Sequence, residues 1–128
     1  MAKAYFVTGT DTGAGKTTVT CALLAAAKAR GLSTLALKPI AAGCEQTADG
    51  LRNSDALALQ AEMTVSLSYQ EINPVALPAA LSPHLAAAAA GRRLTLVQIA
   101  GYCRGALMHK ADFRLVEGAG GWRVPISD

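Results

Sequence analysis

A glycine-rich segment near the start of the sequence restricts the folds that this chain can adopt. Residues 9–17 read GTDTGAGKT, and they connect a short apolar run at 5–7 to an alanine-rich stretch at 16–30. Glycines allow backbone N–H groups to surround a phosphate, and the N-terminus of a following helix favours the anion. A lysine then reaches the β- and γ-phosphates and a hydroxyl ligates Mg²⁺, roles that suit Lys16 and Thr17. The segment therefore predicts a P-loop that binds a nucleotide.

The spacing within this loop departs from the common one. The usual pattern, GxxxxGK followed by Ser or Thr, would place its first glycine at position 10. This chain has Thr10 there, preceded by Gly9, so the loop is one residue longer. A glycine-rich turn with an incidental Lys-Thr pair is the alternative, but an apolar strand before the loop and a helix after it favour the P-loop.

The order of the apolar runs predicts an α/β fold. Residues 5–7 are typical of a buried strand, 16–30 of a helix that stops at Gly31, and 34–37 of a second buried strand. Strand, helix and strand in this order form a βαβ unit, which implies a parallel sheet with a right-handed crossover. A third strand is expected at 112–116. The fold class is then a P-loop NTPase-like parallel sheet flanked by helices.

The segments between these strands are harder to assign. Residues 41–52 carry Gly, Asp, Thr and Gln without periodicity, so we expect a loop there. Capping residues and glycine stops predict three further helices. They are one through 56–59 with Asn53 or Ser54 as its N-cap, one from Ser82-Pro83 to Gly91, and one across 95–110.

An acidic residue follows the third expected strand. Glu117 ends the apolar run at 113–116, and sites in parallel sheets gather at the carboxyl ends of the strands. Glu117 should therefore share an edge of the sheet with the phosphate loop. The small residues after it, Gly118, Ala119 and Gly120, would let the backbone approach phosphates or substrate. An acid that merely ends a strand before a turn is the alternative.

Two further charged residues are candidates for the same edge. Lys38 closes the second strand ahead of Pro39, where its charge could neutralise a phosphate in transfer. A solvated lysine at a strand end is the alternative. Asp55 lies in the first turn of an expected helix, where an acid also complements the helix dipole. Spacing alone leaves the role of Asp55 open.

Charge and composition argue against several function classes. The 12 Lys and Arg form no run and do not interleave with the six aromatic residues (one Trp, three Tyr, two Phe), so nucleic-acid binding has little support. Cys21, Cys44 and Cys103 form no CxxC pair and are expected to be reduced thiols of a cytoplasmic protein. The N-terminus lacks the apolar segment of a signal peptide, and the alanine-rich stretch at 85–90 is too short to span a membrane.

Taken together, these motifs resemble the dethiobiotin synthetase family over the length of the chain. The lengthened phosphate loop combined with the later motifs is more specific than a P-loop alone. The residues that carry the resemblance are YFVTGTD and GKT within 5–17, Lys38-Pro39 with Ala-Ala-Gly at 41–43, LRNSDALAL at 51–59, Asn73-Pro74, Ser82-Pro83-His84 and LVEGAGGW at 115–122.

The resemblance implies an activity, cofactors and partners. Members of the family use ATP and Mg²⁺ to carboxylate 7,8-diaminononanoate with CO₂ or bicarbonate, and they close a ring to give dethiobiotin, ADP and phosphate. They are cytoplasmic homodimers. Lys38 and Lys16 match the lysines that neutralise carbamate and phosphate oxygens, with Lys38 the catalytic one. Thr17, Asp55 and Glu117 match the Mg²⁺ ligands.

The same resemblance assigns binding roles to a larger set of residues. Those that match ATP-binding positions are Gly13, Ala14, Gly15, Lys16, Thr17, Thr18, Asp55, Glu117, Gly118, Ala119 and Gly120. Those that match substrate-binding positions are Thr12, Lys38 and Ala42.

Two other classes of enzyme share part of this pattern. The amidotransferase-type synthetases of cobalamin assembly share the P-loop and the Lys-Pro strand end, but they lack the RNSDAL segment. Partitioning-type switch ATPases carry a second lysine five residues before the position of Lys16, where this chain has Asp11. An inactive remnant that only binds nucleotide is a third alternative. ADP release that depends on the diamine would separate all three from the synthetase.

Some features depart from the family pattern. Gly13 and Ala42 stand where some members carry an acid and a serine, and Arg114 interrupts an apolar strand for no reason visible in the sequence. In the family the sheet continues further, with adenine-recognising residues and the dimer interface. We therefore expect residues 1–128 to form a single P-loop domain that is incomplete at its C-terminus and exposes an apolar sheet edge.

Overall fold

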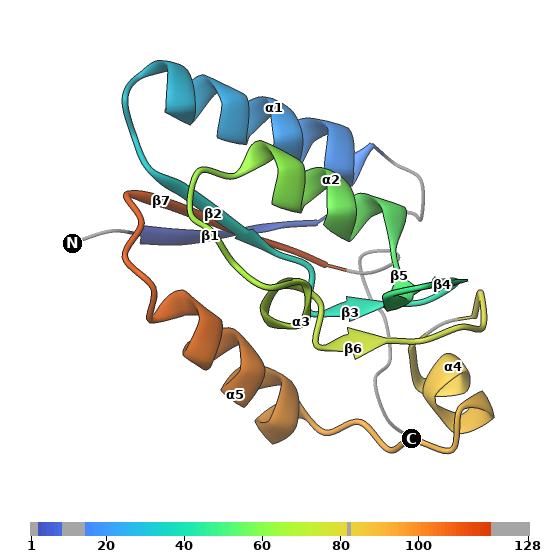
Figure 1. The fold of residues 1–128 in the computed structure, drawn as a ribbon. Helices are drawn as coiled ribbons and strands as arrows, with labels where there is room; N and C mark the ends of the chain where they lie inside the picture. The colour runs from blue at the N-terminus through green and yellow to red at the C-terminus, as the bar shows by residue number, and fades with distance from the viewer. Residues whose placement is uncertain (1–2, 9–14, 82, 119–128) are drawn as a thin grey trace.

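Three parallel strands form the central sheet of the computed structural model, which describes residues 3–8, 15–81 and 83–118 (Figure 1). They are β1 (Lys3–Val7), β2 (Thr34–Leu37) and β7 (Phe113–Glu117), and they lie in the order β1-β7-β2. The predicted α/β fold and its parallel sheet are confirmed. The last strand in the sequence is inserted between the first two, so β1 and β2 do not pair with each other.

The register of the sheet aligns the carboxyl ends of its strands. Val7 of β1 is paired with Glu117 of β7, and Leu37 of β2 is paired with Val116. Lys38, the residue after Leu37, therefore lies beside Glu117 in sequence register. This alignment gathers the residues that follow each strand at one edge of the sheet.

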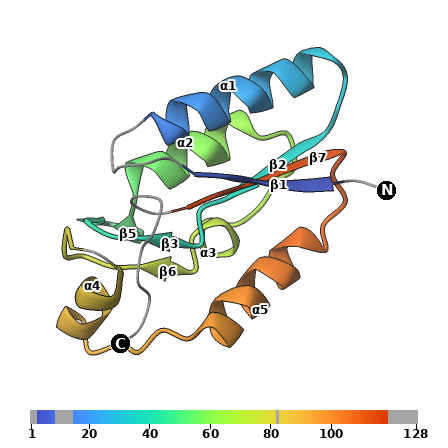
Figure 2. The same cartoon turned by 180° about the vertical axis from the view of Figure 1, so that it is seen from behind.

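Helices cover both faces of the sheet. Helices α1 (Lys16–Ala29) and α2 (Ser54–Glu62) lie together on one face, and α5 (Leu96–Leu107) lies on the other (Figure 2). Gly31, at φ 79°, ends the α1 region as expected from the sequence, because the left-handed conformation costs glycine little. Within the described ranges, no helix is long and apolar enough to cross a membrane.

The main core lies between the sheet and these helices. All four residues of β2 are buried, as a strand covered on both faces requires. The buried apolar side chains of this cluster are Leu24, Leu35, Ala36, Leu37, Ala56, Leu59, Met63, Leu67, Tyr69, Ile72, Ala106, Ala111 and Leu115. A smaller second cluster contains Val75, Leu77, Ala86, Ala87 and Leu94, beside α4 (Pro83–Ala89).

The expectation of a loop across 41–52 is wrong. Strands β4 (Glu45–Thr47) and β5 (Gly50–Arg52) form an antiparallel hairpin, and the short strand β3 (Ile40–Ala41) precedes it. The Thr47 hydroxyl donates to the carbonyl of Gly50 at 2.8 Å and accepts from the amide of Asp49 at 3.2 Å. The hairpin is held by these turn contacts, and β4 is exposed at every residue, so no apolar alternation marked it in the sequence.

Two short elements have no counterpart in the predictions. Helix α3 (Tyr69–Ile72) has only four residues and begins with a capping box, in which Ser68 and Glu71 bond each other's backbone amides. Strand β6 (Val75–Ala76) follows it and pairs in parallel with β3. Neither element is long enough to show a periodicity.

One edge of the sheet is exposed among the described residues. Strand β1 pairs there with β7 alone, and its Tyr5 and Phe6 are 50% and 65% exposed. Within the described ranges β1 is therefore an edge strand with exposed apolar side chains, and the incomplete domain expected from the sequence stays a prediction.

We predict that Leu115→Ala lowers the free energy of unfolding by about 2–5 kcal/mol, because it leaves a cavity in the main core. Leu115 lies on the central strand and is 1% exposed. Leu96→Ala is the matched control, since Leu96 is 72% exposed and its loss should cost within about 0.5 kcal/mol. Urea unfolding of the full gene product measures both, and equal losses would contradict this account of the core.

Candidate active site

A buried ion pair lies at the carboxyl edge of the sheet. The ammonium of Lys38 donates to Oε2 of Glu117 at 2.7 Å, and their side chains are 7% and 0% exposed. The same ammonium contacts Oδ2 of Asp55 at 3.2 Å, but that carboxylate is 46% exposed. The pair with Glu117 is therefore shielded from solvent, whereas the pair with Asp55 is screened by it.

Glu117 also accepts a hydrogen bond from the first helix. The Thr17 hydroxyl donates to Oε2 of Glu117 at 2.8 Å across 100 positions of sequence. Both donors thus converge on one oxygen. The other oxygen, Oε1, is buried and has no hydrogen-bond partner within the described ranges. A buried carboxylate oxygen without a partner is costly, which makes Oε1 a natural acceptor for a ligand or a cation.

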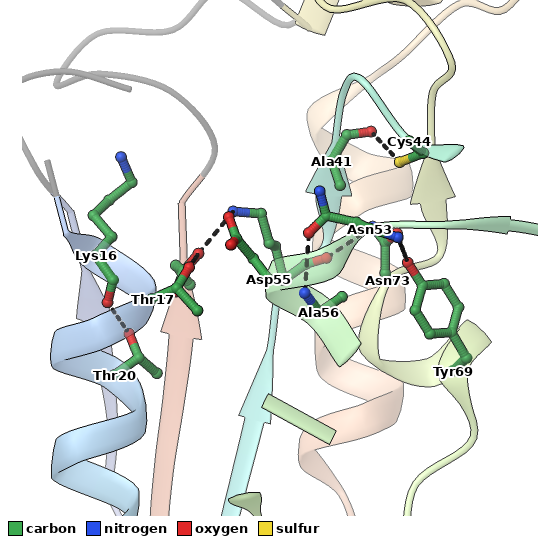
Figure 3. A network of polar contacts seen from close by, with 12 residues as sticks. Lys16, Thr17, Thr20, Ala41, Cys44, Asn53, Asp55, Ala56, Tyr69 and Asn73 are labelled. Atoms are coloured by element: carbon green, nitrogen blue, oxygen red, sulfur yellow. Dashed lines mark hydrogen bonds and ion pairs between the residues drawn. The ribbon is translucent and has the colours of Figure 1, made fainter. Parts of the chain in front are cut away.

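Helix α1 begins at this edge of the sheet. Gly15 precedes it at φ 83°, a conformation that suits the final glycine of a phosphate loop. No side chain among the described residues caps the helix, and its first turn contains no acid. Lys16 is 8% exposed and is the first residue of the helix, directly before Thr17 (Figure 3). The arrangement suits an anion at the helix N-terminus.

Helix α2 supplies Asp55 from a capped first turn. The side chain of Asn53 accepts from the amide of Ala56 at 3.0 Å, which decides between the two N-caps proposed from the sequence. This cap fixes the turn that carries Asp55, whose carboxylate reaches the Lys38 ammonium (Figure 3). Spacing alone left Asp55 open, and its contact with Lys38 now includes it in the site.

The donor set fits Mg²⁺. Magnesium prefers hard oxygen ligands, and the carboxylates of Asp55 and Glu117 both contact the Lys38 ammonium, while the Thr17 hydroxyl bonds the Glu117 carboxylate. The unpartnered Oε1 of Glu117 supports this fit. The described part of the chain contains no cluster of three or more His, Cys, Asp or Glu that could hold a metal, so a site here would need the hydroxyl and further oxygen ligands.

Thiol chemistry has no support near this site. Cys21 lies one helical turn after Thr17, and its pKa is raised, first by burial and then by the negative charges of Glu62, Glu117 and Asp55. Cys44 donates to the Ala41 carbonyl at 3.4 Å, and burial raises its pKa too. Both cysteines are therefore neutral thiols at physiological pH, and thiolate is the nucleophilic form.

The structure brings together Thr17, Lys38, Asp55 and Glu117, with Gly15 and Lys16 at the start of α1. Gly118 follows Glu117, and a Cβ there would meet the Phe6 ring at 3.0 Å, so a larger residue would displace that ring. Thr18 is exposed on α1. Five predicted residues lie outside the described ranges: Thr12, Gly13, Ala14, Ala119 and Gly120.

Two residues from the sequence analysis stay unassigned by the structure. Ala42 follows β3 and packs against the second core cluster, so its role as a substrate contact stays a prediction. Arg114 lies on the central strand with a buried Nε that has no hydrogen-bond partner among the described residues, and nothing in the structure explains it.

The sequence analysis missed the residues behind Lys38. Asn73 is 2% exposed, and its side-chain amide donates to the carbonyl of Lys38 at 2.9 Å. Asn73 entered the analysis only as part of a family motif, and Tyr69, which contacts it, did not enter at all. The available signal was the capping pattern of Ser68 and Glu71 ahead of Asn73-Pro74, which indicates a short helix and a turn.

Comparison with known proteins gives consistent matches. The AAA domain family matches residues 3–128. The chain is 62% identical over 125 residues to the ATP-dependent dethiobiotin synthetase of Cellvibrio japonicus, covering 98% of this chain and 54% of that protein. It is 60% identical to that of Marinobacter nauticus (100% and 55%) and 54% identical to one from Escherichia coli (100% and 56%). The chain spans about half the length of these relatives, and the resemblance expected from the motifs is confirmed.

We predict that Glu117→Gln weakens Mg²⁺-dependent ADP binding by about tenfold or more, because the variant removes a charged oxygen ligand while keeping the side-chain shape. ADP binding without Mg²⁺ should change by no more than about threefold, since the substitution leaves the backbone at the start of α1 unchanged. Titration calorimetry of the full gene product with and without Mg²⁺ measures both affinities.

Glu62→Gln is the matched control for that experiment, since Glu62 lies at the end of the same helix as Asp55 and outside the contacts of Lys38. Equal losses in the presence and absence of Mg²⁺, or an unchanged Glu117→Gln variant, would contradict the ligand role of Glu117.

Proposed function

The chain belongs to the AAA domain family, and on this premise we propose that it carries the ATP site and the catalytic lysine of an ATP-dependent dethiobiotin synthetase. The proposed reaction converts 7,8-diaminononanoate, CO₂ and ATP into dethiobiotin, ADP and phosphate. The observation that carries the proposal is the buried ammonium of Lys38 against Glu117, beside Thr17 at the start of the phosphate-loop helix.

The phosphates of ATP are proposed to bind at the N-terminus of α1. The helix dipole favours an anion there, no side chain of the described residues caps the helix, and Lys16 adds a positive charge at the first position. From the resemblance, the ATP-binding set also includes Gly13, Ala14, Thr18, Gly118, Ala119 and Gly120.

Mg²⁺ would be held by Thr17, Asp55 and Glu117. It would supply positive charge to the β- and γ-phosphate oxygens of the nucleotide. The role of the chain is to fix these three oxygen donors: Thr17 on α1, Asp55 in the capped first turn of α2, and Glu117 at the end of the central strand.

Lys38 is proposed to act on the anionic groups of the reaction. One amine of the substrate attacks CO₂ and loses a proton, which gives a carbamate. A carbamate oxygen then attacks the γ-phosphorus, the bond to ADP breaks, and a carbamic-phosphoric anhydride forms. The second amine attacks the carbonyl carbon and loses a proton, the C–O bond to phosphate breaks, and the ring closes. A fixed ammonium at this position stabilises the negative charge of the transferring phosphoryl group.

Finer features of the proposal rest on the resemblance. The diamine is placed near Lys38, Thr12 and the loop at Ala42. The active form is proposed to be a homodimer in the cytoplasm, with bicarbonate as the source of CO₂.

We predict that the full gene product releases ADP from Mg·ATP and bicarbonate only when 7,8-diaminononanoate is present. Release without the diamine would favour a switch ATPase and contradict the proposal. Lys38→Met should lower the diamine-dependent rate by about 100-fold, the usual cost of losing one charge-stabilising donor. A coupled assay for ADP measures these rates.

Lys28→Met is the control for Lys38→Met, because Lys28 lies in the last turn of α1, away from the carboxyl edge of the sheet. It should retain the rate of the unchanged protein. Thermal unfolding of both variants separates loss of activity from loss of the fold. A folded Lys38→Met protein with full activity would remove Lys38 from the mechanism.

A further inference from the structure

The main chain of Lys38 is held by the last residue of α3 and by the residue that follows it. The amide of Lys38 donates to the carbonyl of Ile72 at 2.9 Å. The carbonyl of Lys38 accepts from Nδ2 of Asn73 at 2.9 Å. The same Nδ2 donates to the carbonyls of Val75 at 3.1 Å and Pro39 at 3.3 Å, so its two hydrogens are shared among three acceptors. Asn73 is 2% exposed, and water does not compete for these contacts.

Tyr69 continues this network toward α2. Its hydroxyl donates to Oδ1 of Asn73 at 2.8 Å and accepts from the backbone amide of Asn53 at 2.6 Å (Figure 3). A backbone amide can only donate, so the hydroxyl proton of Tyr69 must point to Asn73. The side-chain amide of Asn73 is then fixed with its nitrogen toward the Lys38 carbonyl. Burial raises the pKa of Tyr69, which keeps the hydroxyl protonated at neutral pH.

The network closes on the active site. Asn53 is the N-cap of α2, and Asp55 lies in the first turn that Asn53 holds. Asp55 in turn contacts the ammonium of Lys38 at 3.2 Å. The backbone of Lys38 and the helix that carries Asp55 are thus joined from behind through Tyr69 and Asn73, as well as from the front through their side chains.

We infer that Tyr69 and Asn73 are positioning residues, which fix the distance between Lys38 and the first turn of α2. The inference rests on the proposed function, in which Lys38 stabilises the charge of the transferred phosphoryl group. Neither residue needs to touch the substrate. Their effect is to hold an ammonium and a carboxylate from two different elements in one geometry, and small displacements of such groups reduce rates strongly.

Tyr69→Phe tests this inference with little other disturbance. The ring and its stacking under the Arg52 guanidinium, 4.3 Å from the ring centroid, are retained. Only the hydroxyl is lost, and with it the link between Asn73 and Asn53. Asn73→Asp is the second variant, since it exchanges the donating nitrogen for an oxygen that faces three carbonyls.

Thr34→Val is the matched control. The Thr34 hydroxyl also accepts from a backbone amide, that of Thr64 at 3.0 Å, and it is fully buried. It lies at the other end of β2 from Lys38. Thr34→Val therefore removes a hydroxyl that accepts from a backbone amide, as Tyr69→Phe does, but it leaves the network around Lys38 untouched.

In the full gene product, Tyr69→Phe is expected to lower kcat for diamine-dependent ADP release by about tenfold or more, with KM for ATP within about threefold. Thr34→Val is expected to keep kcat within about twofold of the unsubstituted protein, although its melting temperature should fall about as much as that of Tyr69→Phe. A Tyr69→Phe protein whose kcat falls no further than that of Thr34→Val would overturn the inference. Should Asn73→Asp not fold, the comparison of Tyr69→Phe with Thr34→Val still decides the outcome.

A second readout separates this inference from the proposed function. The rate at which an amine-reactive ester acylates Lys38, measured by mass spectrometry, needs no turnover. Lys38 is 6% exposed, and Tyr69→Phe or Asn73→Asp should raise its acylation rate by about threefold or more, whereas Thr34→Val should not. If ADP release does not depend on the diamine but acylation of Lys38 is faster in the variants, the proposed function is rejected and the positioning role of Tyr69 and Asn73 is retained. If ADP release depends on the diamine but neither kcat nor the acylation of Lys38 changes in the variants, only the positioning role is rejected.

Discussion

The arrangement of this protein depends on a single buried contact, the ion pair between Lys38 and Glu117. Burying two charges is favourable only when each is well paired and further bonded, and here the carboxylate accepts from both the ammonium and the Thr17 hydroxyl. The contact requires that β2 and β7 be neighbours with aligned carboxyl ends. It also requires that α1 begin at the same edge. The strand order β1-β7-β2 meets both requirements, since it brings residues 79 and 100 positions apart in sequence into contact.

The remaining elements adjust this contact. Gly15 precedes α1 at φ 83°, and the N-cap at Asn53 fixes the turn from which Asp55 contacts the same ammonium. Behind the sheet edge, Tyr69 and Asn73 tie the backbone of Lys38 to that N-cap. One oxygen of Glu117 is left without a partner among the described residues, which suits a site that gathers oxygen ligands for a cation.

Much of the edge could be predicted from the sequence because it is marked locally. Glycines before Lys16-Thr17, and charged residues directly after apolar runs, indicated the loop, Lys38 and Glu117. Parallel strands place such residues at one edge, so the prediction needed no knowledge of the strand order. Asp55 could not be assigned in this way, because an acid in a first turn also suits the helix dipole.

The network behind Lys38 could not be predicted for a different reason. Tyr69 accepts from a backbone amide 16 positions away, and Asn73 donates to backbone carbonyls up to 35 positions away, and no spacing rule connects these residues. Helix α3 is too short to show a periodicity, and the hairpin at 45–52 has no apolar alternation. Polar side chains hold both elements by hydrogen bonds to nearby backbone groups, and a pattern of apolar residues does not reveal such contacts.

The most direct test of the account is a crystal structure of the full gene product with Mn²⁺ and a non-hydrolysable ATP analogue. Anomalous scattering locates Mn²⁺, which substitutes for Mg²⁺ at oxygen sites. The account predicts the ion at the Thr17 hydroxyl and the carboxylates of Asp55 and Glu117, with the phosphates at the N-terminus of α1 and Lys38 directed at the terminal phosphate. An ion bound by other residues, with the phosphates away from α1, would contradict it.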